Sequence, residues 1–268
     1  MGNKKTGDFL RMPVVHEKEL NWRVKLVAGF LRPIVRLMYG LKVEGIENIP
    51  KTGAYVIGAN HVTYLDALAV AYAVYYRIHR LPHFLAKGNL FKTPVVGAVL
   101  RAVEQVPVYR GGRSNREPMD AANLMLQSGR VIAIFPEGTL TREPDGWPMR
   151  GKVGAIRLAI DNKVPFIPMG QWGTEVVLPT YSKKLRPKPW HKVRMIIGKP
   201  MDLSAYYGKQ LSNSDYTEIT KQAMKEITAL VEELRGAKAP DELFDPRDHG
   251  LSEFGNFKKA PKKQVGEN

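Results

Sequence analysis

Apolar and polar residues along this chain follow two alternating periods, which predict strands that alternate with helices. Short apolar runs predict strands over 54–60, 83–87, 104–109, 131–136, 164–170 and 192–198. Helical spacing of apolar residues predicts helices over 67–78, 89–103, 117–126, 152–160 and from 215 to 235. Pro107 favours an edge position or a bulge for its strand, because proline cannot donate a ladder hydrogen bond. The alternation indicates an α/β domain with a largely parallel central sheet flanked by helices.

An amphipathic pattern precedes this domain. Over 19–39, apolar residues recur at helical spacing with basic residues beside them: Leu26, Phe30, Ile34, Leu37 and Met38, with Arg23, Lys25, Arg32 and Arg36. The pattern predicts an amphipathic helix at a membrane interface. A helix that caps the domain core would show the same pattern, so both interpretations stay open. Pro33 is expected to kink or split the helix.

The two ends of the chain lack such periodicity. Residues 1–18 are polar, and we expect a flexible N-terminus. Residues 239–268 contain proline, glycine and lysine without a repeating apolar position, and we expect them to be disordered. The folded domain is therefore predicted to span 40–238, after the helix over 19–39.

Composition narrows the possible partners and compartments. The chain of 268 residues carries 41 Lys and Arg against 26 Asp and Glu, a net charge of +15. This excess attracts polyanions, either nucleic acid or an anionic membrane, although a generally basic proteome would also produce it. No nucleic-acid reader motif is present, so we expect no nucleic-acid partner. The absence of cysteine excludes disulfides, a thiolate nucleophile and zinc–cysteine sites.

The apolar runs of the sequence also show no recognisable targeting signal. The first residues lack the continuous apolar core of a signal peptide, and no apolar run is long enough to span a bilayer. We therefore expect a cytoplasmic protein that is peripheral on the inner face of the plasma membrane.

A histidine and a carboxylate follow the predicted strand 54–60. His61 and Asp66 lie five positions apart across a strand–loop–helix junction. Neutral imidazole takes a proton from a hydroxyl near pH 7, and a carboxylate on its other nitrogen fixes the tautomer. The pair is a candidate proton-transfer site. The alternative is a histidine that caps a helix with an aspartate in its first turn.

A second polar group follows the predicted strand 131–136. Glu137 can accept hydrogen bonds from hydroxyl groups, and the turn through Gly138 and Thr139 can present backbone N–H groups to a phosphate or a head group. An ordinary turn would also have this sequence. Basic residues gather in the loops near both motifs and favour a phosphate-bearing substrate: Arg110, Arg113, Arg116, Arg142, Arg150 and Lys152.

Four blocks of the chain resemble, in order, the glycerolipid acyltransferase family, typified by 1-acylglycerol-3-phosphate O-acyltransferases. The first block, Asn-His-x-Thr-x-x-Asp, contains Asn60, His61, Thr63 and Asp66. The second contains Lys87, Leu90, Phe91, Pro94 and Gly97 and ends at Arg110, the third is Phe-Pro-Glu-Gly-Thr at 135–139, and the fourth contains Val164, Pro165 and Pro168. The chain departs from the family before Arg110 and after Thr139, so Arg110 and Arg142 could share or exchange the phosphate-binding role.

The resemblance implies transfer of a fatty acyl group from an acyl-CoA or acyl carrier protein thioester to a lysophosphatidic-acid-like acceptor. It implies that His61 is the base, that Asp66 orients it, and that Lys87 or backbone N–H groups stabilise the oxyanion. The residues expected to bind substrate are Asn60, Thr63, Arg110, Glu137, Gly138, Thr139 and Arg142. No metal or cofactor is required beyond the thioester co-substrate, and an anionic membrane would hold the enzyme.

Two alternatives to this function follow from the same residues. The first is the same acyl transfer to another lipid alcohol, such as a glycolipid sugar or an amino-acid lipid. The second is a non-catalytic module that binds anionic lipid or nucleic acid through its charge alone.

Overall fold

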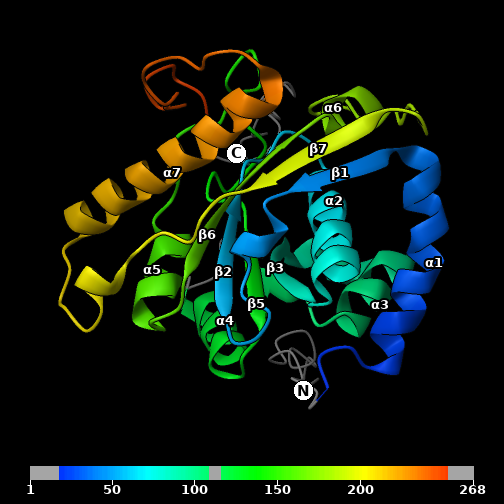
Figure 1. The fold of residues 1–268 in the computed structure, drawn as a ribbon, viewed down its shortest axis with the longest axis horizontal. Helices are drawn as coiled ribbons and strands as arrows, with labels where there is room; N and C mark the ends of the chain where they lie inside the picture. Colours follow the sequence, from blue (N-terminus) through cyan, green and yellow to red (C-terminus); the bar gives the residue numbers. More distant parts are fainter. Residues whose placement is uncertain (1–17, 109–115, 253–268) are drawn as a thin grey trace, which may run out of the picture.

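The computed structural model describes residues 18–108 and 116–252, which form an α/β fold of three layers (Figure 1). Seven strands make one sheet in the order β1-β7-β6-β2-β5-β3-β4. Their bounds are β1 Gly40–Glu44, β2 Tyr55–Ala59, β3 Pro82–Lys87, β4 Val106–Val108, β5 Val131–Ile134, β6 Phe166–Trp172 and β7 Lys192–Ile197. The neighbours from β6 to β4 pair in parallel, whereas β7 is antiparallel to β6. The predicted fold class, with a largely parallel sheet, is confirmed.

Helices cover both faces of this sheet. They are α1 Trp22–Met38, α2 Asp66–Ala73, α3 Pro94–Ala102, α4 Arg116–Gln127, α5 Gly154–Asp161, α6 Thr174–Val177 and α7 Asn213–Arg235. Figure 1 shows α1, α2 and α3 on one side of the sheet and α4, α5 and α7 on the other. Shorter helical turns are Ile46–Asn48, Val74–Ile78, Gly88–Lys92 and Ser204–Tyr206.

Side-chain alternation in the central strands builds two cores. In β2, Tyr55, Ile57 and Ala59 pack in the cluster that includes residues of α1 and α2. Val56, between them, packs in the cluster formed with α4, α5 and α7. Successive side chains of a strand point to opposite faces, so one continuous apolar run supplies both cores. This burial fixes the strand whose end carries His61.

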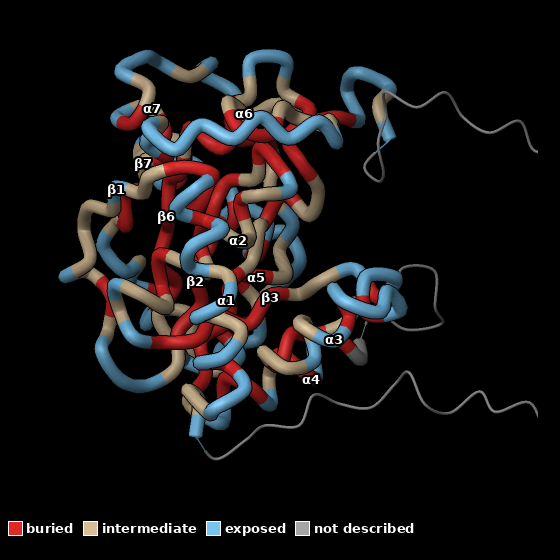
Figure 2. Tube along the Cα trace, turned by 90° about the vertical axis from the view of Figure 1, so that its right-hand side faces the viewer, coloured by how far each residue is buried: buried red, intermediate tan, exposed pale blue. Residues whose placement is uncertain are grey.

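Helix α1 (Trp22–Met38) packs on the core and also exposes an apolar face. Val24, Val35 and Met38 are buried, whereas Trp22 is 70% exposed and Phe30 is 71% exposed. Figure 2 shows the helix lying along the outside of the molecule. In the part of the chain that the structure describes, no helix has both the length and the apolar character needed to cross a bilayer.

Three features differ from the sequence predictions. Strand β1 and the short helix α6 were not predicted, and Pro33 lies inside one uninterrupted helix rather than between two. A proline ring removes only one hydrogen bond of its own helix, and packing of α1 on the core offsets that loss.

The C-terminal segment also differs from expectation. Disorder was expected from residue 239, but residues 239–252 have defined contacts, and Phe244 forms a bridge with Met149. The Arg150 amide donates to the Phe244 carbonyl over 2.9 Å, and the Arg150 guanidinium pairs with Asp245. These contacts stabilise a segment whose own sequence has no helix or strand pattern. Residues 253–268 lie outside the described part.

A glycine in β2 permits close packing behind the site. A Cβ atom on Gly58 would lie 2.1 Å from the Phe166 ring, which is fully buried. We expect Gly58→Ala to destabilise the protein by about 1–3 kcal/mol, because the ring has no space to move into. Urea unfolding followed by circular dichroism measures this loss. Gly29→Ala is the control, because a Cβ atom at Gly29 would have no other atom within 4 Å. Gly53 is equally open, but its positive φ strains any other residue, so Gly53→Ala is less suitable.

Candidate functional site

The carboxyl ends of three neighbouring strands converge at one edge of the sheet. Strand β5 lies between β2 and β3, and Val131 aligns with both Tyr55 and Pro82. His61 follows β2, Glu137 follows β5, and Lys87 ends β3, where its side chain is exposed. Ligand sites of open α/β sheets lie beyond such strand ends. The register therefore places three of the predicted site residues along the same edge.

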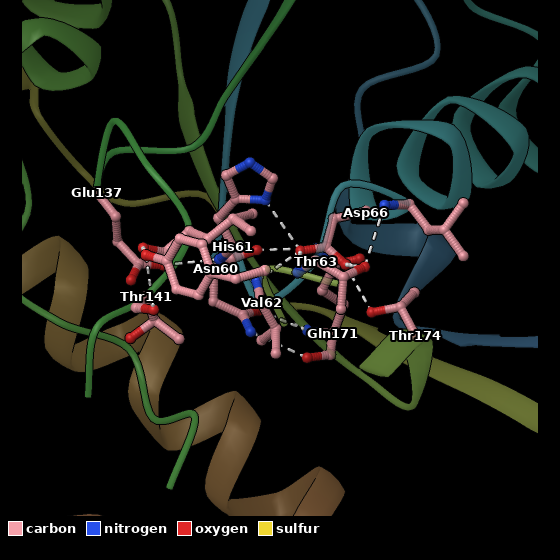
Figure 3. A network of polar contacts seen from close by, with 12 residues as sticks. Asn60, His61, Val62, Thr63, Asp66, Glu137, Thr141, Gln171 and Thr174 are labelled. Atoms are coloured by element: carbon pink, nitrogen blue, oxygen red, sulfur yellow. Dashed lines mark hydrogen bonds and ion pairs between the residues drawn. The ribbon is translucent and has the colours of Figure 1, made fainter. Parts of the chain in front are cut away.

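His61 and Asp66 form a hydrogen-bonded pair in the structure. His61 Nδ1 lies 2.9 Å from Asp66 Oδ2. The carboxylate fixes Nδ1 as the protonated nitrogen and leaves a lone pair on Nε2. Figure 3 shows the imidazole above the loop, with its second nitrogen pointing away from Asp66. That nitrogen is the atom able to accept a proton from a substrate.

Five donors hold the Asp66 carboxylate in place. Oδ2 also accepts the backbone N–H of Val62 at 2.5 Å and of Thr63 at 2.8 Å. Oδ1 accepts the hydroxyls of Thr63 at 3.2 Å and Thr174 at 2.6 Å. Asp66 is completely buried at the start of α2. A buried carboxylate with this many donors is fixed in position and compensated for its desolvation.

The imidazole ring is also fixed from its face. The Phe135 ring stacks on His61 with centroids 4.0 Å apart and planes 12° apart. The His61 side chain retains 17% exposure, so the ring is confined but reachable from solvent. Stacking and the Asp66 bond together leave His61 little rotational freedom, as a positioned general base requires.

Glu137 is buried and hydrogen-bonded to the backbone of His61. One carboxylate oxygen accepts the His61 backbone N–H at 2.7 Å, and the other accepts the Met149 N–H at 3.2 Å. Burial raises the pKa of Glu137 to about 8, against the lowering effect of these two hydrogen bonds. The Glu137 side chain therefore links the histidine loop to the loop before α5.

Asn60 and Thr63 were predicted to bind substrate, and the structure places both within buried networks. The Asn60 side chain donates to the Gln171 carbonyl at 3.0 Å and accepts the Gln171 N–H at 2.8 Å. These bonds join the ends of β2 and β6. Sequence reasoning did not identify Gln171 or Thr174, although Gln171 directly follows the apolar run 164–170 and Thr174 comes three positions later. Proximity to a strand end was the available signal.

The turn after Glu137 approaches a lysine closely. Gly138 has φ +71°, and a Cβ atom there would lie 3.2 Å from Cδ of Lys152. Further along the turn, Arg142 is buried, and the Tyr181 hydroxyl donates to the Leu140 carbonyl at 2.9 Å. Gly138, Thr139 and Arg142 thus share one connected turn. Arg110 lies outside the described residues.

A pocket of about 200 Å³ opens beside Glu137, between the loop before α5 and the C-terminal segment. Its lining includes Arg150, Lys152 and Arg247 together with Asp245. Asp245 pairs with the Arg150 guanidinium at 2.8 Å and with Arg247 at 2.7 Å. The cations exceed the carboxylates that face them, so the pocket suits an anionic group.

The fold and this site define an α/β protein whose histidine–aspartate pair is placed to take a proton from a substrate hydroxyl. Residues 40–172 match the acyltransferase family. The 1-acyl-sn-glycerol-3-phosphate acyltransferase of Bacillus subtilis is 30% identical over 216 residues, covering 78% of this chain and 99% of that protein. The chain therefore belongs to the acyltransferase family and is an acyltransferase.

Two further similarities agree with this assignment. The crystal structure of the 1-acyl-sn-glycerophosphate acyltransferase PlsC from Thermotoga maritima superposes with a TM-score of 0.62 at 27% identity, covering 81% of each chain. The chloroplastic 1-acyl-sn-glycerol-3-phosphate acyltransferase LPAT1 of Arabidopsis thaliana is 29% identical over 165 residues, which cover 61% of this chain and 44% of LPAT1. The two bacterial proteins match most of this chain, whereas the matched region makes up less than half of the plant protein.

Proposed function

We propose that this enzyme transfers a fatty acyl group from an acyl-CoA or acyl carrier protein thioester to the free hydroxyl of lysophosphatidic acid, which yields phosphatidic acid. The observation that carries the proposal is the fixed His61–Asp66 pair, at 2.9 Å, beside a turn and a pocket that suit a phosphate. The names of the similar bacterial and plant proteins support the same acceptor.

The reaction proceeds by direct attack of the acceptor. Nε2 of His61 takes the hydroxyl proton while the acceptor oxygen forms a bond to the thioester carbonyl carbon. Asp66 stabilises the imidazolium that results. The carbon–sulfur bond then breaks, and His61 returns the proton to the departing thiolate. Lys87 or backbone N–H groups at the sheet edge stabilise the oxyanion of the tetrahedral intermediate.

Acceptor binding involves the turn that follows Glu137. Gly138, Thr139 and Arg142 hold the glycerol phosphate, and Arg110 contributes to the same site. Glu137, Asn60 and Thr63 position these groups, since their side chains bond to Met149, Gln171 and Asp66 rather than project into solvent. This proposed positioning role differs from the direct contact with substrate that was expected from the sequence for the three residues.

The pocket lined by Arg150, Lys152 and Arg247, called here the phosphate pocket, leads to a measurable prediction. We expect Lys152→Ala to raise the KM for lysophosphatidic acid by about ten- to a hundredfold, because loss of one charge-assisted hydrogen bond costs about 1.5–3 kcal/mol. The KM for the acyl donor should stay unchanged. Initial rates with varied acceptor measure the effect, and Lys225→Ala, an exposed lysine on α7, is the control. A rise confined to the donor KM would assign the pocket to the donor instead.

Thiol release from palmitoyl-CoA tests the function as a whole. The purified protein should release CoA only when lysophosphatidic acid is present, and mass spectrometry should detect phosphatidic acid. Release with monoacylglycerol or a glycolipid but not with lysophosphatidic acid would replace the proposed acceptor by another lipid alcohol. No release from either an acyl-CoA or an acyl carrier protein thioester would favour the non-catalytic binding module.

The enzyme is proposed to work on the inner face of the cytoplasmic membrane, held by α1. Trp22, Leu26, Phe30 and Leu37 form an exposed apolar stripe on this helix, called here the α1 stripe. Exposed Arg23, Lys25, Arg32 and Arg36 flank it. An apolar stripe bordered by cations is the arrangement that binds an anionic membrane surface. Both the acceptor and the product are lipids of such a surface.

A further inference from the structure

The loop between α6 and β7 is strongly basic and carries an exposed tryptophan. Four Lys and Arg residues and no acidic residue lie in residues 178–191, between α6 and β7. Residues 183–190 of this loop are all exposed, Trp190 by 94% and Leu185 by 44%. An exposed tryptophan among basic residues is a combination enriched where proteins meet a membrane–water interface. We call residues 178–191 the basic loop.

Hydrogen bonds give the basic loop a defined shape. The Arg186 amide donates to the Val177 carbonyl at 2.7 Å, and the His191 amide donates to the Lys188 carbonyl at 2.9 Å. Pro187 and Pro189 further restrict the backbone on either side of Lys188. Trp190 is therefore presented outward by a fixed loop, which lowers the entropy lost when the indole is bound.

The basic loop adjoins the end of α1. The Lys188 amide donates to the Met38 carbonyl at 2.8 Å, and the Gly40 amide donates to the His191 carbonyl at 2.8 Å. In Figure 1 the connection between α6 and β7 lies beside the upper end of α1. The basic loop therefore adjoins the C-terminal end of α1, next to Leu37 of the α1 stripe.

The opposite end of the basic loop reaches the candidate active site. Tyr181 of this loop donates its hydroxyl to the Leu140 carbonyl at 2.9 Å, within the turn that contains Thr139 and Arg142. Anchoring of the loop would therefore fix the position of this turn relative to whatever surface the loop contacts.

We propose that the basic loop is a second membrane contact, which binds anionic lipid head groups through its Lys and Arg residues and places Trp190 at head-group depth. The proposal rests on the peripheral membrane placement proposed above and adds a residue set outside α1. Tryptophan favours the membrane–water interface, and each Lys or Arg near an anionic surface contributes about 1 kcal/mol. Two separated contacts fix the orientation of the enzyme, which one helix alone leaves free to rotate about its axis.

Continuity with the α1 stripe favours a membrane over an acidic protein as the partner. An acidic carrier protein would also be attracted by Lys183, Lys184 and Arg186. It would not explain the exposed tryptophan and the exposed apolar side chains of the adjoining helix α1. A lipid surface satisfies the charge and the exposed apolar side chains together.

Sedimentation with vesicles tests the proposal. The triple variant Lys183→Gln, Lys184→Gln, Arg186→Gln should bind phosphatidylcholine–phosphatidylglycerol vesicles about a hundredfold more weakly than wild type, as loss of three charges at about 1 kcal/mol each implies. The matched control replaces Lys209, Lys221 and Lys225, three exposed lysines outside α1 and the loop, by glutamine. Equal binding of the loop variant and the control variant would overturn the proposal.

Tryptophan fluorescence gives an independent readout. Anionic vesicles should shift the emission of wild type to shorter wavelength, and Trp190→Phe should lose part of that shift while circular dichroism stays unchanged. An undiminished shift in this variant would show that Trp190 stays in water, against the proposal. Phosphatidylcholine vesicles without anionic lipid should bind only weakly.

Activity assays separate this proposal from the proposed function. With acceptor in neutral detergent micelles, the loop variant should retain wild-type activity. If wild type itself is inactive there, the proposed transfer to lysophosphatidic acid fails, while the vesicle result still decides the membrane contact. Normal vesicle binding with a selective loss of activity on acyl carrier protein thioesters would assign the loop to the carrier protein and overturn the lipid contact.

Discussion

Replacement of His61 by alanine should reduce acyl transfer by about 10²–10⁴-fold, because the variant has no group to take the acceptor proton. The reduction should appear in kcat, with the KM for acceptor and donor changed little. In the proposed reaction His61 acts only on the reacting hydroxyl, and its ring does not line the pocket beside Glu137. CoA release measured at saturating lysophosphatidic acid gives this number directly.

A second histidine supplies the control for this experiment. His79 is exposed and has φ +59°, a conformation that asparagine tolerates, so His79→Asn should leave activity and folding unchanged. Circular dichroism should show that His61→Ala is folded, since the Phe135 ring and Asp66 retain their other contacts. A His61→Ala enzyme with wild-type kcat would contradict the role of His61 as the base.

The order of the strands and helices could be predicted from the sequence, because short apolar runs mark the strands and helical spacing of apolar residues marks the helices. The six predicted strands correspond to β2 through β7, and Pro107 lies in β4, at the sheet edge, as predicted. Strand β1 escaped prediction because its ladder depends on β7, more than a hundred residues away. Local propensity carries no information about such a partner.

The candidate site could be predicted from the sequence only in part. His61 and Glu137 follow apolar runs, so their shared position at the sheet edge follows from parallel pairing. The partners that hold them do not share this signal. Thr174 reaches Asp66 from 108 positions further along the chain, and Phe135 stacks on His61 because β2 and β5 are adjacent. Tertiary contacts of this kind become visible only once the strand order is known.

The phosphate pocket shows the same dependence on tertiary structure. Arg247 belongs to a segment that its sequence marks as disordered, and the contact of Phe244 with Met149 brings it beside Lys152. Arg150 and Lys152 were expected near the site from their place in the chain. The third cation of the pocket had no sequence signal.

Burial of Glu137 makes the free energy of unfolding depend on pH. Burial raises the pKa of this carboxyl from 4.5 to about 8 in the folded protein. Between these two values the folded protein retains a proton that the unfolded chain has lost. The free energy of unfolding therefore falls as pH rises through this interval, by up to about 1.4 kcal/mol per pH unit from this group. Below pH 4.5 both states are protonated and the dependence disappears.

Glu137→Gln should weaken both activity and stability. Both carboxylate oxygens of Glu137 accept backbone N–H groups, from His61 and from Met149. Glutamine offers one oxygen, and its amide group would face one of these donors, which leaves a buried N–H without an acceptor at a cost of about 1–3 kcal/mol. A shift of the His61 backbone should lower kcat by about tenfold or more, because displacement of a reacting group by 1 Å costs up to about 10²-fold.

Unfolding of the wild type and of Glu137→Gln by urea at several pH values checks this prediction. The wild type should lose stability relative to the variant as pH rises from 5 to about 8, because only the wild type has a carboxyl to ionise there. The stability advantage of the wild type is thus largest near pH 5. Parallel pH profiles would show that Glu137 is already ionised in the folded protein at pH 5. In that case the two backbone N–H groups stabilise the charge more strongly than burial opposes it.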